Sequence, residues 1–426
     1  MNQRTLGILI FVVIALVAIY SATTPETMRV APGEEARLLA AVDGDEVARV
    51  RIEQGEQSVE LRVNKGNWSV PARGGYRADG SKVRSLLLKL FDLTVSQKLP
   101  ATDASFDKLG VSDEAVKRGQ SRITFFNAAD RELGGVRIGE ARKTKPGSDA
   151  KSAASGGQYV RSLSGKEVYL VALPLQFSVT PSYWLDQNVI NVLPAHLRSV
   201  EMFTSADGSS KQEYVLKRVG EAVPGTTPTF ELVNATVPAG KSVQDVAVSQ
   251  VRSGLENVRL QDVFPKDSPE VKDLQFDATA VYRLESGLIY TVESAERKDK
   301  EPRFFARISA QFDPAVGAEV EAFNKSVEEE LAKKAAETKP SDSKPVESKT
   351  DAAEKPAPQK KPLSSEKEAE QQRAQFAGWV FELPPYQSVK LRQRFDNLVQ
   401  APDPASEQPP QAMPNEIMEL PKEAAE

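Results

Sequence analysis

The stretch VARVRIEQGEQSVELRV, Val47 to Val63, decides the predicted fold. Apolar residues alternate with charged or polar ones on both sides of the turn residues Gln54 to Glu56. A period of two is the spacing of a strand that buries one of its faces. We therefore predict a β-hairpin with strands at Val47 to Glu53 and Ser58 to Val63.

Downstream of the hairpin the pattern continues as one unit of strands and helices. A short strand at Trp68 to Val70 stops at Pro71. A helix opened by Asp79 or Ser81 follows, with apolar residues on one face at spacings of three and four. Four further strands and a helical stretch are expected at Arg122 to Asn127, Leu133 to Ile138, Gln158 to Ser162, Glu167 to Val171 and Pro174 to Val192.

After His196 the same order of elements begins again. The second set consists of three strands and a helix, expected at Ser199 to Thr204, Gln212 to Val219, Phe230 to Val233 and Ser242 to Leu255. The positions of Trp68 and Phe230 differ by 162 residues, and those of Ile123 and Val281 by 158. Two nearly equal offsets favour an internal duplication.

Extra chain interrupts both copies. The closing strands, near Leu170 and Phe381, are 211 residues apart, and a low-complexity segment at 326–372 accounts for the excess over the first offset. A smaller insertion at Glu140 to Gly157 is expected in the equivalent hairpin of the first copy. The predicted fold class is α+β, with an N-terminal transmembrane helix followed by two tandem, duplicated α+β domains that contain antiparallel sheets.

Upstream of the hairpin, Leu6 to Ala22 is an uncharged, mostly apolar run that follows Arg4. Such a run predicts a membrane-spanning helix, and the preceding charge keeps the N-terminus in the cytoplasm and exports the bulk of the chain. A cleaved signal peptide has the same start and apolar middle. Cleavage after Ala22 would place Tyr20 where a small residue is required, so we favour an uncleaved single-pass anchor.

The charged insertion and the C-terminal tail have no apolar periodicity. Helices are expected at both ends of the insertion, at Val316 to Ala336 with coiled-coil character and after Ser365, where Glu368 completes a capping box. The proline-rich middle, Thr338 to Pro362, predicts disorder. In the tail, Ile417, Met418 and Leu420 form a possible short docking motif, although plain solvated chain is the commoner role of such a tail.

These features together predict six regions. They are a cytoplasmic N-terminus (1–5), a transmembrane helix (6–22), a juxtamembrane linker (23–45), a first α+β repeat domain (46–195), a second α+β repeat domain (196–400) with a charged insertion (326–372), and a disordered acidic, proline-rich tail (401–426).

Composition excludes several kinds of chemistry. The 426 residues contain no cysteine, which excludes disulfides, iron–sulfur clusters and thiol catalysis. The 55 basic residues are scattered among 60 acidic ones, so nucleic acid is not an expected partner. We expect no cofactor and no metal.

No catalytic constellation is visible either. His196 is the single histidine, so multi-histidine metal sites are excluded, and it lies between the two copies without a nucleophile motif. Asp113 with Glu114, and Glu328 to Glu330, are acidic neighbours that solvated surface explains better than catalysis. The sequence thus predicts no catalytic, cofactor-binding or metal-binding residue and no enzymatic activity.

Glycine pairs and aromatic residues also have ordinary explanations. The pairs at 74–75, 134–135 and 156–157 lack a phosphate-loop context and predict turns. The aromatic residues could line a ligand groove: Trp68, Tyr76, Tyr183, Trp184, Trp379 and Tyr386. Trp68 and Trp379 lie in predicted strands, so core packing is expected of them, whereas Tyr183 and Trp184 are expected at the joint between the copies.

The order of short motifs resembles a known bacterial family, called domain of unknown function 4340. The motifs are GNWSVP, RADGSKVRSLLLKLFDL, FDKLGV, RITFF, VRIGE, QYVR, VYLV and the closing WVFELPPYQSVKLRQRFDNLV, which together cover about Glu46 to Val399. The resemblance implies one N-terminal membrane helix and genes often placed beside gliding-type ABC transport components. It implies no catalytic residues. The long charged insertion departs from the family's simpler pattern.

Three functions remain open from the sequence. The first is a non-enzymatic, membrane-anchored exported scaffold or accessory subunit of an ABC-type transport or surface-assembly complex, with permease components as partners, in the bacterial inner membrane. The second is a cell-envelope module that binds a glycan or another polymer, which an aromatic groove would favour. The third, an envelope hydrolase, has no nucleophile, base or metal cluster behind it.

Overall fold

The computed structural model describes residues 37–400, apart from 94, 96, 100, 143–156, 172–174, 207–208, 221–227, 299 and 338–359. Contacts between residues divide the chain into Met1–Gln187 and Asn188–Glu426, here called unit 1 and unit 2. The domain boundaries expected from the sequence, 46–195 and 196–400, stay a prediction about independent folding.

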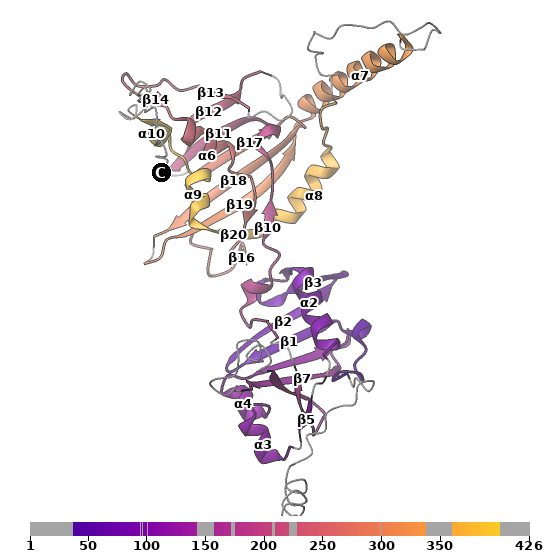
Figure 1. The fold of residues 1–426 in the computed structure, drawn as a ribbon. Helices are drawn as coiled ribbons and strands as arrows, with labels where there is room; N and C mark the ends of the chain where they lie inside the picture. The colour runs from indigo at the N-terminus through magenta and orange to yellow at the C-terminus, as the bar shows by residue number, and fades with distance from the viewer. Residues whose placement is uncertain are drawn as a thin grey trace, which may run out of the picture. The chain divides into compact units, whose positions relative to one another are not determined.

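The fold class predicted from the sequence is wrong. The described residues form mostly antiparallel sheet with few helices. A nine-stranded sheet in unit 1 and an eight-stranded sheet in unit 2 account for most of this structure (Figure 1). No helix in the described part of the chain is long and apolar enough to cross a membrane. The run Leu6 to Ala22, expected to do so, lies outside the described residues.

Unit 1 is built on a nine-stranded antiparallel sheet within its described residues. In spatial order its strands are β4 (Tyr76–Arg77), β3 (Asn67–Val70), β2 (Gln57–Asn64), β1 (Arg49–Gln54), β6 (Ser121–Phe126), β7 (Glu132–Ala141), β8 (Gln158–Ser162), β9 (Val168–Val171) and β5 (Gln97–Leu99). The predicted hairpin is confirmed, since Val50 pairs with Leu61 and Ile52 with Val59. Gly55 makes the turn at φ +61°, a conformation that glycine adopts without strain.

The helix α2 (Gly80–Phe91) packs on the apolar face of this sheet. Asp79 caps α2 by accepting hydrogen bonds from the backbone N–H groups of Ser81 and Lys82. Phe91 at the last turn stacks on Phe125 of β6, with ring centroids 5.4 Å apart. We call this side of the sheet the helix face of unit 1, and the opposite side its charged face.

Two short helices cross the far end of the charged face. They are α3 (Asp103–Lys108) and α4 (Asp113–Lys117), which follow the edge strand β5. Phe106 and Val111 pack there with Val168 of β9 in a small separate core. Gly139 of β7 permits this approach, because a Cβ atom there would lie 2.2 Å from the carbonyl oxygen of Leu109. α4 meets the end of β1 and, through Asp113, Arg122 of β6, whereas Arg51 and Arg62 on the same face stay partly exposed.

Unit 2 repeats the strand order of unit 1. Its eight-stranded antiparallel sheet contains β13 (Phe230–Val233), β12 (Ser209–Arg218), β11 (Leu197–Ala206), β17 (Ala278–Leu284), β18 (Leu288–Arg297), β19 (Arg303–Phe312), β20 (Trp379–Leu383) and β16 (Asp262–Pro265). Taken in this order, the strands correspond one by one to β3, β2, β1, β6, β7, β8, β9 and β5. Two small strand pairs accompany the sheet, β10 (Asn188–Ile190) with β15 (Val258–Arg259) and β14 (Ser242–Val243) with β21 (Val399–Gln400).

Short helices cover one face of this second sheet as well. They are α6 (Asp245–Arg252), α8 (Glu366–Phe376), α9 (Pro385–Leu391) and α10 (Phe395–Leu398). Tyr282 of β17 donates its hydroxyl hydrogen to the carbonyl oxygen of Val251 in α6. Phe376 of α8 packs edge-on against Tyr290 and Phe381 of the same sheet face. The opposite face of unit 2 carries Glu201 and Arg283, and we call it the charged face of unit 2.

The insertion enters the connection between β19 and β20. It begins with α7 (Pro314–Glu337), and Asp313, just before this helix, accepts hydrogen bonds from the backbone N–H groups of Ala315 and Val316. It ends with α8, which Ser365 caps as predicted. No second long helix of the described chain packs along α7, so the coiled-coil expectation has no support. The segment expected to be disordered lies outside the described residues up to Gln359.

The two insertions do not share one loop, so that prediction is wrong. The extra chain of unit 1 lies between β7 and β8, whose counterparts in unit 2 are β18 and β19, whereas the large insertion follows β19. Offsets along the sequence miss this difference, because successive hairpins in an antiparallel sheet have similar lengths and patterns.

Three further local predictions fail. The helix expected at Pro174 to Val192 is replaced, in its described part, by the 3-10 turn η3 (Pro181–Trp184) and by β10. The glycines at 134–135 lie inside β7 rather than in a turn. Ile123 faces the buried side of its sheet, whereas Val281 faces the charged side, so the proposed match is one residue out of register.

Candidate functional site

The acidic pairs and the histidine noted in the sequence do not come together as a site. His196 is exposed at the end of the 3-10 turn η4 (Pro194–His196). Glu114 forms an ion pair with Lys117 one turn along its own helix, and Glu328 pairs with Lys360. Asp113 instead reaches the charged face of unit 1, where it meets arginines of β6 and β7.

The aromatic residues are divided between core and surface. Trp184 is 1% exposed and donates its indole N–H to the carbonyl oxygen of Ser178, while Tyr183 packs edge-on against it. Trp68 and Trp379 are half-buried in β3 and β20, and Tyr386 is exposed on α9. Trp184 of unit 1 therefore serves packing, whereas Trp379 of unit 2 lines a surface hollow.

Arginine side chains line up across the charged face of unit 1. Strand register places Arg49 opposite Arg62 and Arg51 opposite Glu60. Farther along the same face, Glu53 lies opposite Arg122, which in turn lies opposite Arg137 of β7. Like charges directly opposite each other destabilise a sheet unless carboxylates bridge them. The arrangement therefore depends on its acidic residues.

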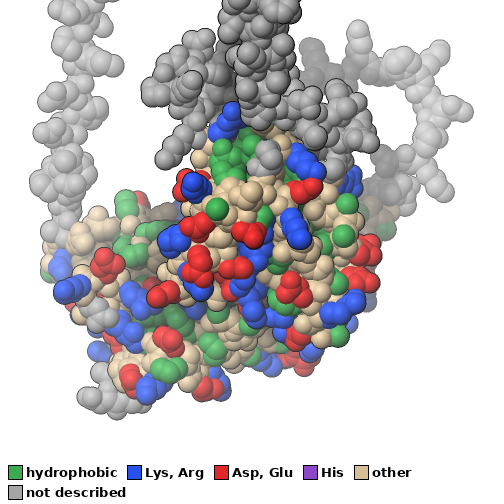
Figure 2. All heavy atoms as spheres, turned by 90° about the horizontal axis from the view of Figure 1, so that it is seen from below, with side chains coloured by type: hydrophobic (Ala, Val, Ile, Leu, Met, Phe, Trp, Pro, Cys, Tyr) green, Lys and Arg blue, Asp and Glu red, His purple; other side chains and the backbone are tan. Residues whose placement is uncertain are grey.

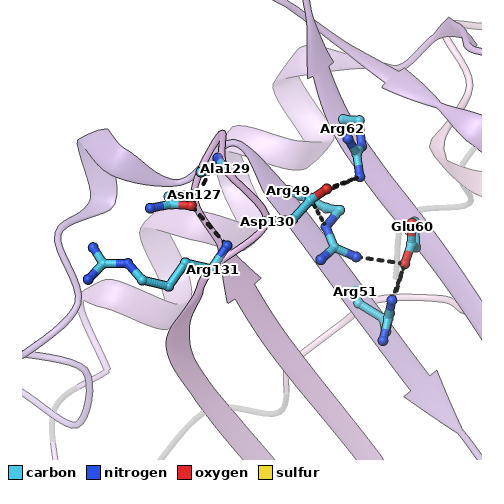
Figure 3. A network of polar contacts seen from close by, with 8 residues as sticks. All are labelled: Arg49, Arg51, Glu60, Arg62, Asn127, Ala129, Asp130 and Arg131. Carbon is cyan, nitrogen blue, oxygen red and sulfur yellow. Dashed lines mark hydrogen bonds and ion pairs between the residues drawn. The ribbon is translucent and has the colours of Figure 1, made fainter.

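A tight turn supplies one of these acids. Between β6 and β7, the side-chain oxygen of Asn127 accepts hydrogen bonds from the N–H groups of Ala129 and Arg131 (Figure 3). This Asx turn holds Asp130 at φ +60°, a left-handed conformation that Asp tolerates better than most residues. The Asp130 carboxylate is thereby placed 3.0 Å from both Arg49 and Arg62.

Arg49 is the most enclosed member of the array. Only 7% of the residue is exposed, and its guanidinium lies 3.6 Å from the centroid of the Phe126 ring. A partly desolvated cation–π contact of this kind contributes about 1–2 kcal/mol. Arg49 also donates to Glu60 at 3.0 Å, so it is held by an aromatic ring and by carboxylates from two different elements.

Glu60 joins the two arginines of β1. Its carboxylate accepts hydrogen bonds from Arg51 at 2.6 and 2.8 Å and from Arg49 at 3.0 Å. Burial acts to raise the pKa of Glu60, but the hydrogen bonds and positive charges of Arg51 and Arg49 outweigh it and hold the pKa below its usual value. Glu60 is therefore ionised at neutral pH, and both arginines stay in fixed positions.

A second group of arginines meets α4. Asp113, the first residue of α4, accepts hydrogen bonds from Arg137 of β7 and lies 3.5 Å from Arg122. Arg161 of β8 donates to the carbonyl oxygen of Val111 and stacks 4.1 Å from the Phe106 ring centroid. Burial and the neighbouring charge of Arg137 lower the pKa of Arg161.

The charged face of unit 2 is hollowed where α7 begins. Two adjoining hollows of 260 and 340 Å³ share Arg198, Lys217 and Val316 in their walls. We call them together the α7 groove. Their remaining lining residues are Ser199, Val215, Arg218, Gly220, Arg283, Leu284, Glu285, Gly287, Ile289, Asp313, Glu319, Val320, Phe323 and Lys361.

A third hollow of 290 Å³ lies beside β19 and is lined in part by Arg307, Phe376 and Trp379. The guanidinium of Arg307 stacks 3.9 Å from the Phe276 ring centroid. On the surface drawn in Figure 2, basic side chains are interspersed with acidic ones rather than gathered by sign. Such a surface suits a partner that itself carries both charges better than it suits a polyanion.

Comparison with known proteins identifies a family. Residues 68–279 match the family model described as domain of unknown function (DUF4340). This chain belongs to the DUF4340 family. No curated protein and no solved structure matches it.

The matched part of this DUF4340 chain runs from β3 into β17 and so crosses from unit 1 into unit 2. It includes Asp130, Arg137 and three basic residues of the α7 groove, Arg198, Lys217 and Arg218. It ends before α7 itself. The groove in this DUF4340 chain is thus lined by residues of β11 and β12 inside the matched segment and by residues of α7, in the insertion, outside it.

The charged face of unit 1 is a network of side chains that hold one another in place. Among the described residues no group of three or more His, Cys, Asp or Glu side chains is arranged to hold a metal ion. The polar side chains of the unit 1 face are engaged in ion pairs and hydrogen bonds that fix their positions. A signal for this face exists in the sequence of this DUF4340 chain, because Arg49, Arg51 and Glu53 alternate with the buried Val50 and Ile52.

Proposed function

We propose that this chain is a non-enzymatic exported scaffold, an accessory subunit of an ABC-type transport or surface-assembly complex at the bacterial inner membrane. The observation that carries the proposal is the charged face of unit 1, where Arg51 and Arg62 are held by ion pairs and yet stay partly exposed. The family's usual gene neighbourhood, implied by the resemblance of the motifs, supports the choice of an ABC permease component as partner.

The physical argument is preorganisation. A partner that binds Arg51 and Arg62 meets side chains whose conformations are already restricted by Glu60 and Asp130. Binding then costs less side-chain entropy than it would on free lysines. Arginine is also enriched among the residues that dominate protein interfaces, because its planar group forms paired hydrogen bonds and stacks on apolar surface.

The location belongs to the same proposal. It rests on the charge and apolar character of residues 1–22, which favour an exported chain held at the inner membrane. Alkaline phosphatase fused after Val399 is expected to be active in cells. An active cytoplasmic reporter at the same position would contradict export of both units.

A direct test uses two matched pairs of substitutions in the full chain. Arg51→Gln with Arg62→Gln removes two positive charges from the charged face, whereas Arg84→Gln with Lys89→Gln removes two from the exposed side of α2. After purification in mild detergent, the first pair is expected to reduce co-purifying permease at least tenfold. The second pair is expected to leave it unchanged.

Two outcomes count against the scaffold. Equal recovery of permease with both variants would show that the charged face of unit 1 is not the binding surface. Failure of the unaltered chain to retain any membrane protein would contradict the accessory role itself. Circular dichroism of both variants establishes that each remains folded.

Binding of an envelope glycan is the second candidate, and the hollow beside β19 favours it. Trp379 and Phe376 line this hollow together with polar residues of β18 and β19, a mixture found in sugar-binding sites. Retention of the full chain on immobilised envelope glycan, and its loss in a Trp379→Ala variant, would support this candidate over the scaffold.

A further inference from the structure

The α7 groove of unit 2 has apolar walls and a basic rim. Val316, Val320 and Phe323 of α7 form one wall. Val215 of β12 and Ile289 of β18 contribute to the other, on the charged face of the sheet. An extended segment with apolar side chains can bury them between these walls, which is the usual source of affinity in a groove.

Most charges around the groove are already paired. Arg218 forms an ion pair with Glu285, Arg198 lies 3.0 Å from Glu319, and Arg283 lies 2.5 Å from Glu201. The acidic residue left over is Asp313, whose carboxylate caps the start of α7. The paired groups fix the shape of the rim and add little net charge.

Two lysines supply the positive charge that remains. Neither Lys217 nor Lys361 has a carboxylate partner within the described part of the chain, although the Lys361 ammonium lies 4.4 Å from the Phe323 ring centroid. Hydrogen bonds between the Lys361 backbone and the Asn324 side chain, 2.8 and 2.9 Å long, fix this residue beside α7. The groove therefore offers two cations to an anionic ligand: Lys361, which is fixed beside α7, and the exposed Lys217, which lies opposite Glu231 of β13 in strand register.

Exposed apolar residues flank the lysines. Val219 is 48% exposed and lies next to Gly220 of the groove, and Leu363 is 46% exposed two residues after Lys361. The third hollow of unit 2 differs in this respect, because Lys266 and Arg307 are balanced there by Asp267 and Glu293. An acidic segment with apolar side chains thus matches the α7 groove better than the hollow beside β19.

The chain itself contains such a segment. Residues 401–426 hold six acidic residues and one lysine, and within them Glu416, Ile417, Met418, Glu419 and Leu420 combine two carboxylates with three large apolar side chains. β21 ends at Gln400, which pairs with Ser242 of unit 2. Sixteen residues of extended chain reach about 50 Å, more than the roughly 40 Å width of an eight-stranded sheet, so the segment is long enough to cross the sheet of unit 2.

We propose that residues 416–420 bind in the α7 groove of the same chain. Glu416 and Glu419 neutralise Lys217 and Lys361, and the three apolar side chains occupy the space between α7 and the sheet. This intramolecular docking goes beyond the scaffold role and does not depend on it. Its consequence is that a partner with a similar acidic segment must displace the tail before it can enter the groove.

Disulfide trapping in the full chain tests the proposal, because the chain has no cysteine of its own. Val219→Cys with Asn415→Cys places one thiol at the groove mouth and one beside the docking segment, and leaves the proposed contacts intact. The matched control is Lys241→Cys with Asn415→Cys. Lys241 is exposed and adjacent to Ser242, hence closer to the point where the tail begins.

A freely moving tail meets nearby positions most often, so without docking the Lys241 pair forms its disulfide faster. With docking, the Val219 pair is expected to form it at least tenfold faster than the control. The further substitutions Glu416→Lys and Glu419→Lys are expected to reverse this order. Faster reaction of the Lys241 pair in the parent, or no effect of the two lysines, overturns the proposal.

The groove side is tested in the same assay. Lys217→Glu is expected to slow trapping of the Val219 pair at least tenfold, whereas Lys211→Glu, on an exposed residue near the other end of β12, is expected to leave the rate unchanged. Crosslinked dimers as the main product on a non-reducing gel would assign the groove to the tail of a second copy, contrary to the proposal.

Discussion

Units 1 and 2 have the same strand order but treat their charged faces differently. In unit 1 the short turn between β6 and β7 delivers Asp130 to a pair of facing arginines, and the face closes into a network of ion pairs. In unit 2 the long connection between β19 and β20 adds α7 beside the sheet, and the face is hollowed next to it. The sheet order is the constant feature, and the connections determine what each face can bind.

The comparison also shows where extra chain is tolerated. Unit 1 lengthens its β7–β8 connection and unit 2 the connection after β19, which is the next one along the sheet. Antiparallel neighbours need only a short link, so either connection can grow without changing the pairing of its strands. The two insertions differ in what they pack against. In unit 2 the insertion ends in α8, whose Phe376 packs against Tyr290 and Phe381 on the helix face of the sheet.

The largest expected effect tests whether the units are independent. Phe376→Ala removes a ring that is 2% exposed in unit 2, and Phe125→Ala removes one that is fully buried in unit 1. Each substitution should cost about 3–5 kcal/mol of unfolding free energy, because a large cavity replaces a packed ring. Hydrogen exchange followed by mass spectrometry should show lost protection in the altered unit alone.

The two variants are controls for each other. Loss of protection in both units after either substitution would mean that they unfold as one cooperative body. The comparison between them would then describe two halves of one domain rather than two units.

A smaller effect tests the network that distinguishes unit 1. Asp130→Asn keeps a residue type that accepts φ +60° but removes the charge beside Arg49 and Arg62. Unfolding in urea should show a loss of about 1 kcal/mol, since Arg49 is enclosed and, among the described residues, keeps Glu60 alone as an acidic partner. Asp130→Ala should lose a further ~1 kcal/mol through backbone strain. An Asn variant as stable as the parent would show that the turn carboxylate contributes nothing.

Local features of both units could be predicted from the sequence. The alternation from Val47 to Val63 fixes both the hairpin and the side that carries charge. The capping of α2 by Asp79 and of α8 by Ser365 depends on residues two or three positions away, so it is visible without a structure. Short-range hydrogen bonding and periodicity account for these successes.

Features that depend on distant residues could not be predicted. The contact of Asp130 with Arg49 joins positions 81 residues apart, and no local pattern marks it. Asp113 of α4 meets Arg137 of β7 because α3 and α4 cross the charged face. That contact cannot be predicted without knowing the order of the strands in the nine-stranded sheet. The α7 groove requires β11, β12, β17 and the insertion together, and its basic rim consists of residues that look individually like ordinary surface.

The smallest expected effect concerns acid. Because the pKa of Glu60 is lowered in the folded chain, its ionisation stabilises unit 1 fully at pH values above the unfolded pKa, about 4.3. This contribution is lost as the pH falls through the lower, folded pKa. The unfolding free energy of the parent minus that of Glu60→Gln should therefore be constant near neutrality and decrease below about pH 4.3, by at most about 1 kcal/mol for a partly exposed group. A difference for Glu60→Gln that stays constant down to pH 2 would mean that the carboxylate gains nothing from Arg49 and Arg51, and that Phe126 and Asp130 hold Arg49 without it.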